Sequence, residues 1–268
     1  MLLVQFFPDA PDALDELHRI KDMGLKGVKL HPDYQGFFVD DEKLKPIYKK
    51  ISELGLITVF HAGVDFGFAP PYCATPERLE KALSWFESPV VAAHFGGLAC
   101  YEGVLERLCG KENLYIDTSF GYSTLPRYYA LKIIEKHSAD KVLFGTDTPW
   151  HTAKMELRLL ENLALGVDEL EKIKYKNALK MLRIKKIYKI LKKVLTNGIR
   201  CGNISKSPKG DTQLVLIAVR VHPFPYRTRK LSSLALKILG GKLPGKISRC
   251  QHSRHIATGY VSFLLNQA

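Results

Sequence analysis

The sequence predicts an α/β fold on a parallel sheet with six strand–helix units, either an incomplete (β/α)8 barrel of the TIM type or an open doubly wound sheet. Short apolar runs alternate with helical patterns throughout residues 1–182, which is typical of parallel sheets. The runs are continuous rather than alternating, as in strands that are covered on both faces. No GxGxxG or GxxxxGK(S/T) loop is present, so no nucleotide-binding motif favours the open sheet.

The expected elements follow one another regularly. Strands are short apolar runs, expected at residues 2–6, 27–30, 56–60, 90–93, 114–116 and 141–144. Helices are expected at 10–23, 41–54, from 76 onward, and at 101–108, 125–137, 153–163 and 168–182. Gly24 and Gly55 end the first two helices, and Thr75 caps the third with Pro76 at its first position. The order of elements therefore supports repeated strand–helix units.

The charge distribution separates the C-terminal segment from the rest of the chain. Residues 183–268 hold 18 of the 40 basic residues and only Asp211 among the acids, a net charge of +17, whereas residues 1–182 carry −4. This break predicts a boundary near residue 182. We interpret 183–268 as a basic tail that is disordered or not a functional module. A tail that binds nucleic acid or an anionic membrane is the alternative.

Composition limits the class of protein. Apolar residues make up 46% of the chain, enough for a core, and no continuous apolar run is long enough to predict a membrane span. The five cysteines are scattered without a CxxC spacing, which favours a reducing compartment. We therefore expect a cytoplasmic globular protein.

Four polar residues stand at or just after predicted strand ends, and they are His31, His61, His94 and Asp147. In a parallel barrel every strand points its carboxyl end at one face, where the active site lies. Imidazole and carboxylate together suit Zn²⁺ or another first-row divalent ion. Asp117 also ends a strand, but we favour a turn or helix cap over a role in the site. The sequence therefore predicts a metal site at this face.

The other three histidines of residues 1–182 do not follow this pattern. His18 lies in a predicted helix, and His137 and His151 are interpreted as surface or loop residues. A single histidine after a strand is more often structural than catalytic. The hypothesis of a site therefore depends on three histidines following successive strands.

The segments around these residues resemble those of the amidohydrolase-related family. They read Gly-Val-Lys-Leu-His-Pro, Val-Phe-His-Ala-Gly, Ala-Ala-His-Phe-Gly-Gly, Tyr-Ile-Asp-Thr-Ser and Phe-Gly-Thr-Asp-Thr-Pro-Trp, in this order. That family includes proteins similar to aminocarboxymuconate-semialdehyde and resorcylate decarboxylases and to metal-dependent ester and lactone hydrolases. The resemblance covers residues 1–182 and implies a (β/α)8 barrel with one divalent metal, Zn²⁺ first and Mn²⁺ as the alternative.

The resemblance also implies a role for each residue. His61 corresponds to a metal ligand, and Asp147 to a residue that is both ligand and proton carrier. His94 corresponds to a catalytic histidine beside the metal, and His31 is expected to contact the substrate.

One family motif is missing from this sequence. The family has a His-x-His motif at the end of its first strand, which supplies two metal ligands, and the chain contains no His-x-His. The six strands therefore correspond to the third to eighth of the barrel, and we interpret the chain as truncated at its N-terminus. With fewer than three good ligands, metal affinity should fall steeply. We therefore expect poor metal binding and little turnover.

The leading hypothesis is a metal-dependent hydrolase that cleaves C–N or C–O bonds with a metal-activated water. Two alternatives remain: a non-oxidative decarboxylase of a small carboxylic acid on the same site, and a catalytically inactive remnant or basic nucleic-acid-binding protein. The expected partner is a small-molecule substrate, with a homodimer left open. Neither nucleic acid nor membrane is favoured as a partner.

Overall fold

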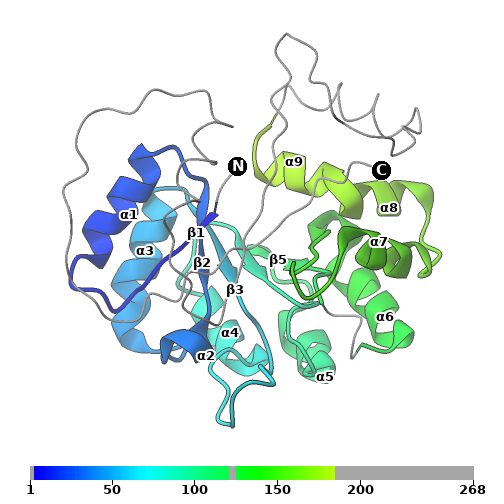
Figure 1. Ribbon diagram of the computed structural model, residues 1–268, viewed down its shortest axis with the longest axis horizontal. Coiled ribbons are helices and arrows are strands. Elements are labelled where there is room, and N and C mark those ends of the chain that lie inside the picture. Colours follow the sequence, from blue (N-terminus) through cyan, green and yellow to red (C-terminus); the bar gives the residue numbers. More distant parts are fainter. Residues whose placement is uncertain (1–2, 121–124, 185–268) are drawn as a thin grey trace.

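The structure is a computed structural model that describes residues 3–120 and 125–184. Its sheet has six strands in sequence order, β1 (Leu3–Gln5), β2 (Gly27–Leu30), β3 (Ile57–Phe60), β4 (Val90–Ala92), β5 (Leu114–Asp117) and β6 (Val142–Leu143). All neighbouring strands are parallel. The prediction of an α/β fold is confirmed, and the sheet forms a partial (β/α)8 barrel (Figure 1).

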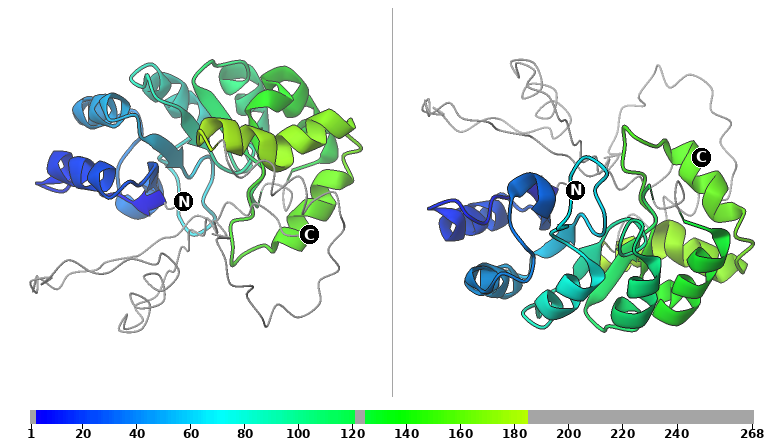
Figure 2. Two further views of the ribbon diagram at one scale, coloured as in Figure 1. Left: turned by 90° about the horizontal axis from the view of Figure 1, so that it is seen from above. Right: turned by 90° about the horizontal axis from the view of Figure 1, so that it is seen from below.

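Helices join successive strands and lie in an arc around the sheet (Figure 2). The α-helices are α1 (Ala13–Asp22), α2 (Pro32–Gln35), α3 (Lys45–Glu53), α4 (Pro76–Leu83), α5 (Tyr101–Gly103), α6 (Arg127–His137), α7 (Ala153–Glu161), α8 (Val167–Glu171) and α9 (Asn177–Met181). Shorter or wider helical turns are η1 (Glu42–Leu44), η2 (Val104–Leu108), η4 (Ala139–Lys141) and η5 (Lys172–Lys176). Each expected helix is therefore present, several of them divided into consecutive segments.

Local chemistry explains where some helices begin and end. The Thr75 side chain accepts a hydrogen bond from the backbone N–H of Arg78, so the predicted cap of α4 is confirmed. The short helix α2 was not expected from the sequence. Pro32 starts it and Gly36, at φ 71°, ends it after a single turn, which is too short to show an apolar period.

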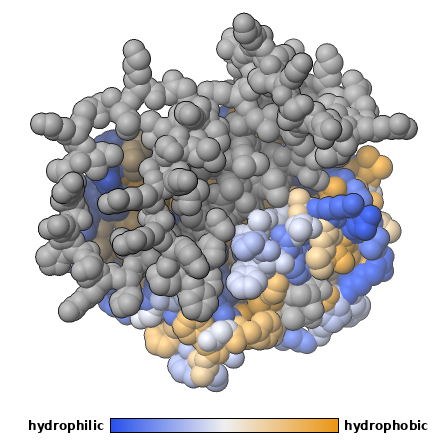
Figure 3. Space-filling view, in the orientation of Figure 1, coloured by the Kyte–Doolittle hydropathy of each residue, from blue (hydrophilic) through white to orange (hydrophobic). Residues whose placement is uncertain are grey.

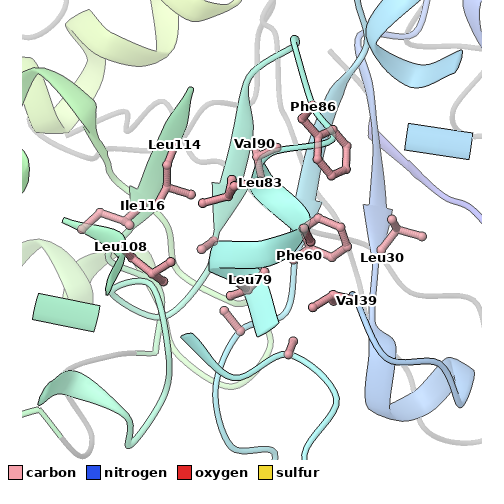
Figure 4. Packing of buried hydrophobic residues seen from close by; sticks show 14 of the residues in the cluster. Leu30, Val39, Phe60, Leu79, Leu83, Phe86, Val90, Leu108, Leu114 and Ile116 are labelled. Carbon is pink, nitrogen blue, oxygen red and sulfur yellow. The ribbon is translucent and has the colours of Figure 1, made fainter. Parts of the chain in front are cut away.

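The outer face of the sheet carries the larger apolar cluster. Val28, Leu30 and Phe60 point outward from β2 and β3 and pack with residues of the surrounding helices. Figure 4 shows Phe60 beside Phe86 and close to Leu79 of α4. This layer joins the helices to the sheet, because burial of apolar surface is the main stabilising contribution.

The inner face carries a second, smaller cluster. Ile57 and Val59 of β3 point inward with Val91 of β4, Leu143 of β6 and Leu182. Because side chains alternate along a strand, the next inward position after Val59 belongs to residue 61. The backbone pattern therefore directs the residue after β3 into the barrel.

Helix α9 closes the side of the barrel at which the strands begin (Figure 1). Ala178 packs into the inner cluster. The buried side-chain amide of Asn177 donates hydrogen bonds to the carbonyl oxygens of Ala139 (2.6 Å) and Val142 (2.8 Å). These bonds fix α9 to the start of β6, so the open face of the barrel lies at the carboxyl ends of the strands.

The boundary that the charge break predicts near residue 182 stays a prediction. Apart from Arg183 and Ile184, the basic tail lies outside the described residues. Among residues 3–120 and 125–184, no helix is both long enough and apolar enough to cross a membrane.

Candidate functional site

The four residues expected at the site line one cavity of about 260 Å³ at the carboxyl ends of the strands. His31 and His61 directly follow β2 and β3, His94 lies two residues after β4, and Asp147 lies four after β6. In Figure 3, apolar side chains gather at the lower end of the molecule, where the loop after β3 lies in Figure 1. The structure therefore brings all four residues together.

The histidine rings form a hydrogen-bonded chain. His94 Nδ1 lies 2.8 Å from the carbonyl oxygen of Ser119, and His94 Nε2 lies 3.1 Å from Nδ1 of His61. A carbonyl oxygen only accepts, so Nδ1 of His94 carries the hydrogen and, in a neutral ring, Nε2 accepts. His61 then donates from Nδ1, and its Nε2 keeps a free lone pair. That Nε2 is buried and has no hydrogen-bond partner among the described residues.

His31 stacks on His61. Their ring centroids lie 4.2 Å apart with an angle of 13° between the planes. Burial, and then the charge of Lys29, lowers the pKa of His31 well below its usual value. Burial also lowers the pKa of His61, with smaller contributions from His31 and His94. Both rings are therefore neutral near pH 7, as metal ligands must be.

Gln35 holds His31 in place. Its side-chain oxygen accepts a hydrogen bond from the backbone N–H of His31 (2.7 Å), and its amide nitrogen donates to the carbonyl oxygen of Phe6 (2.6 Å). One residue of α2 thus joins the ends of β1 and β2. The unexpected helix α2 therefore positions part of the site.

Asp117 supports His94 from the end of β5. Its Oδ1 accepts hydrogen bonds from the backbone N–H groups of His94 (3.1 Å) and Ser119 (3.0 Å) and from the Ser119 hydroxyl (2.5 Å). Asp117 is 1% exposed and does not line the cavity. Its position indicates that it orients His94 rather than contacting a substrate.

Several site residues have left-handed backbone conformations. His94 (φ 60°), Phe120 (φ 52°) and Asp147 (φ 53°) lie in a region that costs roughly 1–2 kcal/mol per non-glycine residue. Such strain clusters at functional sites, where the surrounding structure holds it in place. These backbone conformations therefore indicate that the fold holds the three side chains in specific positions at the site.

Lys29 is a site residue that the sequence interpretation missed. It lies inside β2 and is 5% exposed, and it lines the cavity. Burial lowers the pKa of Lys29, whereas the charges of Asp117 and Asp147 raise it. The sequence does contain a signal for Lys29, since it is a charged residue in an otherwise apolar strand. It stands two positions before His31, so both side chains point to the inner side of the sheet.

Asp65 is the second missed residue. Its Oδ1 accepts a hydrogen bond from the backbone N–H of Gly67 (2.8 Å), and its Oδ2 lies 3.4 Å from Nε2 of His31. One potential ligand atom from each of His31, His61 and Asp65 lies within 4.8 Å of the others. Asp147 does not belong to such a group within the described parts of the chain. No spacing rule points to Asp65, because it lies in an irregular loop.

Aromatic side chains form the rest of the cavity wall. The aromatic lining residues are Tyr34, Phe66, Phe120 and Trp150. Three of them are exposed at the rim, with Phe66 at 65%, Trp150 at 57% and Tyr34 at 43%. The cavity therefore combines a polar end with flat apolar walls.

The interpretation of His137 as a surface or loop residue is wrong, because it is the buried last residue of α6, whereas His151 does lie in a loop but is also buried. His137 is 3% exposed and accepts a hydrogen bond at Nδ1 from the backbone N–H of Gly110 (3.1 Å). His151 is 8% exposed and its Nδ1 pairs with the buried Glu156. Each is adjacent to a chain turn in sequence, but tertiary packing buries it.

The donor set fits a divalent cation. Two neutral imidazoles and a carboxylate are ligands that Zn²⁺ and Mn²⁺ accept. A buried imidazole nitrogen without a partner is costly unless a ligand satisfies it. The bare Nε2 of His61 and the neighbouring Asp65 therefore support the prediction of a metal at this face.

A sequence model of the family described as amidohydrolase (Amidohydro_2) matches residues 2–184, more than half of the chain. The chain belongs to the amidohydrolase family. The resemblance inferred from the strand-end motifs is therefore confirmed. No curated protein matches the chain by sequence.

Several solved structures share the fold. A 2,6-dihydroxybenzoate decarboxylase from Rhizobium is 17% identical with a TM-score of 0.52, over 66% of this chain and 68% of that chain. A dihydroxybenzoic acid decarboxylase from Polaromonas sp. JS666, with bound manganese and 2-nitroresorcinol, is 17% identical with a TM-score of 0.50, over 64% and 65%. A putative 2-pyrone-4,6-dicarboxylic acid hydrolase from Pseudomonas putida is 16% identical with a TM-score of 0.51, over 68% and 71%. At these identities the likeness shows the fold.

Proposed function

We propose that this amidohydrolase-family chain is a metal-dependent, non-oxidative decarboxylase of a small aromatic carboxylic acid. The observation that carries the proposal is the cavity of about 260 Å³, which joins aromatic walls to a polar end with Lys29, histidines and Asp147. Flat apolar walls suit a single ring, and convergent polar groups orient it. The similar structures support the same choice, because decarboxylases outnumber hydrolases among them.

The substrate carboxylate would enter the polar end of the cavity. The ammonium group of Lys29 is the cation that lines this end, and its charge would attract the carboxylate. A divalent ion held at the histidine cluster would polarise the substrate's oxygens and draw electron density from the ring. The walls formed by Phe120 and Trp150 would hold the ring and limit its access to water.

Asp147 and His94 would handle the proton. Asp147 would pass a proton, taken up when the substrate is bound, to the ring carbon that bears the carboxylate. The carbon–carbon bond then breaks, its electron pair restores the aromatic ring, and CO₂ leaves. Asp147 regains a proton from solvent. His94 lines the same cavity and accepts hydrogen bonds at Nε2, so it would assist the proton transfer.

Hydrolysis is the second candidate, and the likeness to the putative hydrolase from Pseudomonas putida favours it. The same His94 and Asp147 would then assist attack by water on a carbonyl carbon, with cleavage of a C–N or C–O bond. The two reactions differ in their products, since only decarboxylation releases CO₂.

The test uses the whole chain supplied with Mn²⁺ or Zn²⁺ and a panel of hydroxylated benzoates in D₂O. We expect CO₂ release and one deuterium at the vacated ring carbon of the product. Asp147→Asn should lower kcat by about 100-fold or more, and the exposed carboxylate variant Asp140→Asn should leave it unchanged. Cleavage of lactones or esters without CO₂ would support the hydrolase instead. No reaction with either class would mean an inactive remnant.

A further inference from the structure

A buried pair of ionisable side chains lies beside the cavity, in the loop and helix that follow β6. Nδ1 of His151 is hydrogen-bonded to Oε1 of Glu156, which lies in the first turn of α7. Both side chains are buried, and neither lines the cavity in the described part of the chain. The proposed reaction uses neither residue, so the burial of two polar side chains here needs another explanation.

Glu156 lies where an ionised carboxylate is disfavoured. Burial raises the pKa of Glu156 to about 8, and the charges of Asp117 and Asp147 also raise it, whereas a hydrogen bond with the Phe120 backbone lowers it. Its Oε2 has no hydrogen-bond partner among the described residues, which is costly for a charged oxygen. Burial also lowers the pKa of His151. Near pH 7 the pair is therefore neutral, with the carboxyl hydroxyl donating to Nδ1 of the ring.

The loop of residues 147–152 is bonded to itself. The backbone N–H of Trp150 donates to the carbonyl oxygen of Asp147 (3.0 Å), and the Thr148 hydroxyl donates to the carbonyl oxygen of His151 (3.2 Å). The loop therefore forms a compact unit, and the side chain of His151 attaches this unit to α7.

His151 also joins this unit to the cavity wall. Its ring packs against that of Phe120, with centroids 4.6 Å apart and an angle of 52° between the planes. Phe120 lines the cavity, as do Asp147 and Trp150. Phe120 and Asp147 also have the left-handed backbone conformations that the surrounding structure must hold in place. Cavity-lining residues from two separate segments of the chain therefore depend on one side chain.

We propose that the buried His151–Glu156 pair positions the proton donor Asp147 and the aromatic wall of the cavity for catalysis. The pair acts only through the residues that it holds, so both members are positioning residues. Such positioning matters because a misplacement of about 1 Å can cost about 100-fold in rate. The inference rests on the proposed function for the reaction itself, but the attachment of the loop can be measured without it.

The experiment follows Trp150 by time-resolved fluorescence anisotropy in the whole chain. Trp85 is the second of the two tryptophans and packs against the core, so Trp85→Phe leaves Trp150 as the probe. In this background Trp150 should rotate mainly with the whole molecule. Glu156→Leu removes the partner of His151 and should raise the amplitude of the fast, nanosecond decay about twofold or more. Glu156→Gln keeps a hydrogen bond to Nδ1 and should restore the original decay.

Activity is measured on the same variants with a hydroxylated benzoate that the wild-type chain decarboxylates. Glu156→Leu should lower kcat by about tenfold or more, and Glu156→Gln should restore it. His137→Leu is the matched control, because it also removes a buried histidine that bonds to another segment, at Gly110. It should lower the urea midpoint but leave kcat and the anisotropy of Trp150 unchanged.

Two patterns of anisotropy would overturn the inference: an unchanged decay in Glu156→Leu, or an equal change in His137→Leu. Loss of kcat in Glu156→Gln with a normal decay would also overturn it, in favour of a proton relay through the pair.

If Glu156→Leu does not fold, the double variant His151→Leu/Glu156→Leu replaces it, because neither partner is then left unpaired. The expected anisotropy pattern without decarboxylation by the wild-type chain would refute the proposed function alone. Decarboxylation with an unchanged decay in the leucine variants would refute the positioning role alone.

Discussion

Replacement of Gly63 by alanine tests how the loop after β3 holds the site. An added Cβ would lie 2.2 Å from the backbone nitrogen and 2.4 Å from the oxygen of Leu98, distances that real contacts do not reach. The residue also has φ +88°, which costs an alanine roughly 1–2 kcal/mol. Forced repacking adds about 1–3 kcal/mol. We therefore expect Gly63→Ala to lower the free energy of unfolding by about 2–5 kcal/mol.

Gly110 offers a control with the same backbone conformation. It also has φ +88°, but an added Cβ would meet no atom within 4 Å. Gly110→Ala should therefore cost only the conformational term of roughly 1–2 kcal/mol. Urea unfolding of both variants measures the difference in stability. Gly63→Ala should also weaken Zn²⁺ binding, because His61 and Asp65 lie close to Gly63 on either side. Equal losses of stability in the two variants would refute the argument from close packing.

Two further predictions concern buried polar groups. Asp117→Ala leaves the N–H groups of His94 and Ser119 without their acceptor, so we expect a loss of about 2–6 kcal/mol in unfolding free energy. The exposed Asp140→Ala should cost below about 1 kcal/mol, and similar losses would contradict the prediction. Burial lowers the pKa of His137 to about 4. The unfolded chain binds this proton more readily, so stability should fall as the pH drops from about 6.5 to 4. His137→Gln should flatten that decline in urea midpoints, and an unchanged pH dependence would refute the assignment.

The strand–helix order was predictable from the sequence for a physical reason. A strand covered on both faces must be apolar throughout, as β3 (Ile57–Phe60) is. An amphipathic helix repeats its apolar residues every three or four positions, as α1 (Ala13–Asp22) does. Both patterns are local, so they can be recognised in the sequence without knowledge of the tertiary structure. The one-turn helix α2 has no such pattern and was missed.

The strand-end residues were predictable because of the topology of parallel sheets. All carboxyl ends meet at one face, so His31, His61 and His94 had to converge once their strands were known. Prediction of Lys29 as a site residue needed one further inference. Its side chain lies on the same side of β2 as that of His31 and therefore also points inward. A lysine in a buried strand is a usable signal when the inner face of the sheet is known.

Asp65 could not be found in the same way. Its position depends on backbone hydrogen bonds from the loop after β3 to Ala74 and to Leu98, and Leu98 is distant in sequence. Burial of His137 and His151 likewise results from packing against segments that local composition does not reveal. These features arise from contacts between separate parts of the chain, and no periodicity encodes them.

The sequence by itself determined the six strand–helix units, the family and the four residues that converge at the strand ends, because each follows from local patterns and from parallel topology. Only the tertiary structure decided which groups lie within reach of a common ion. Distances of a few ångströms depend on loop paths, and these are set by long-range hydrogen bonds such as that between Val64 and Leu98. The direction of hydrogen bonding through Ser119, His94 and His61 is likewise visible only once these residues are in contact.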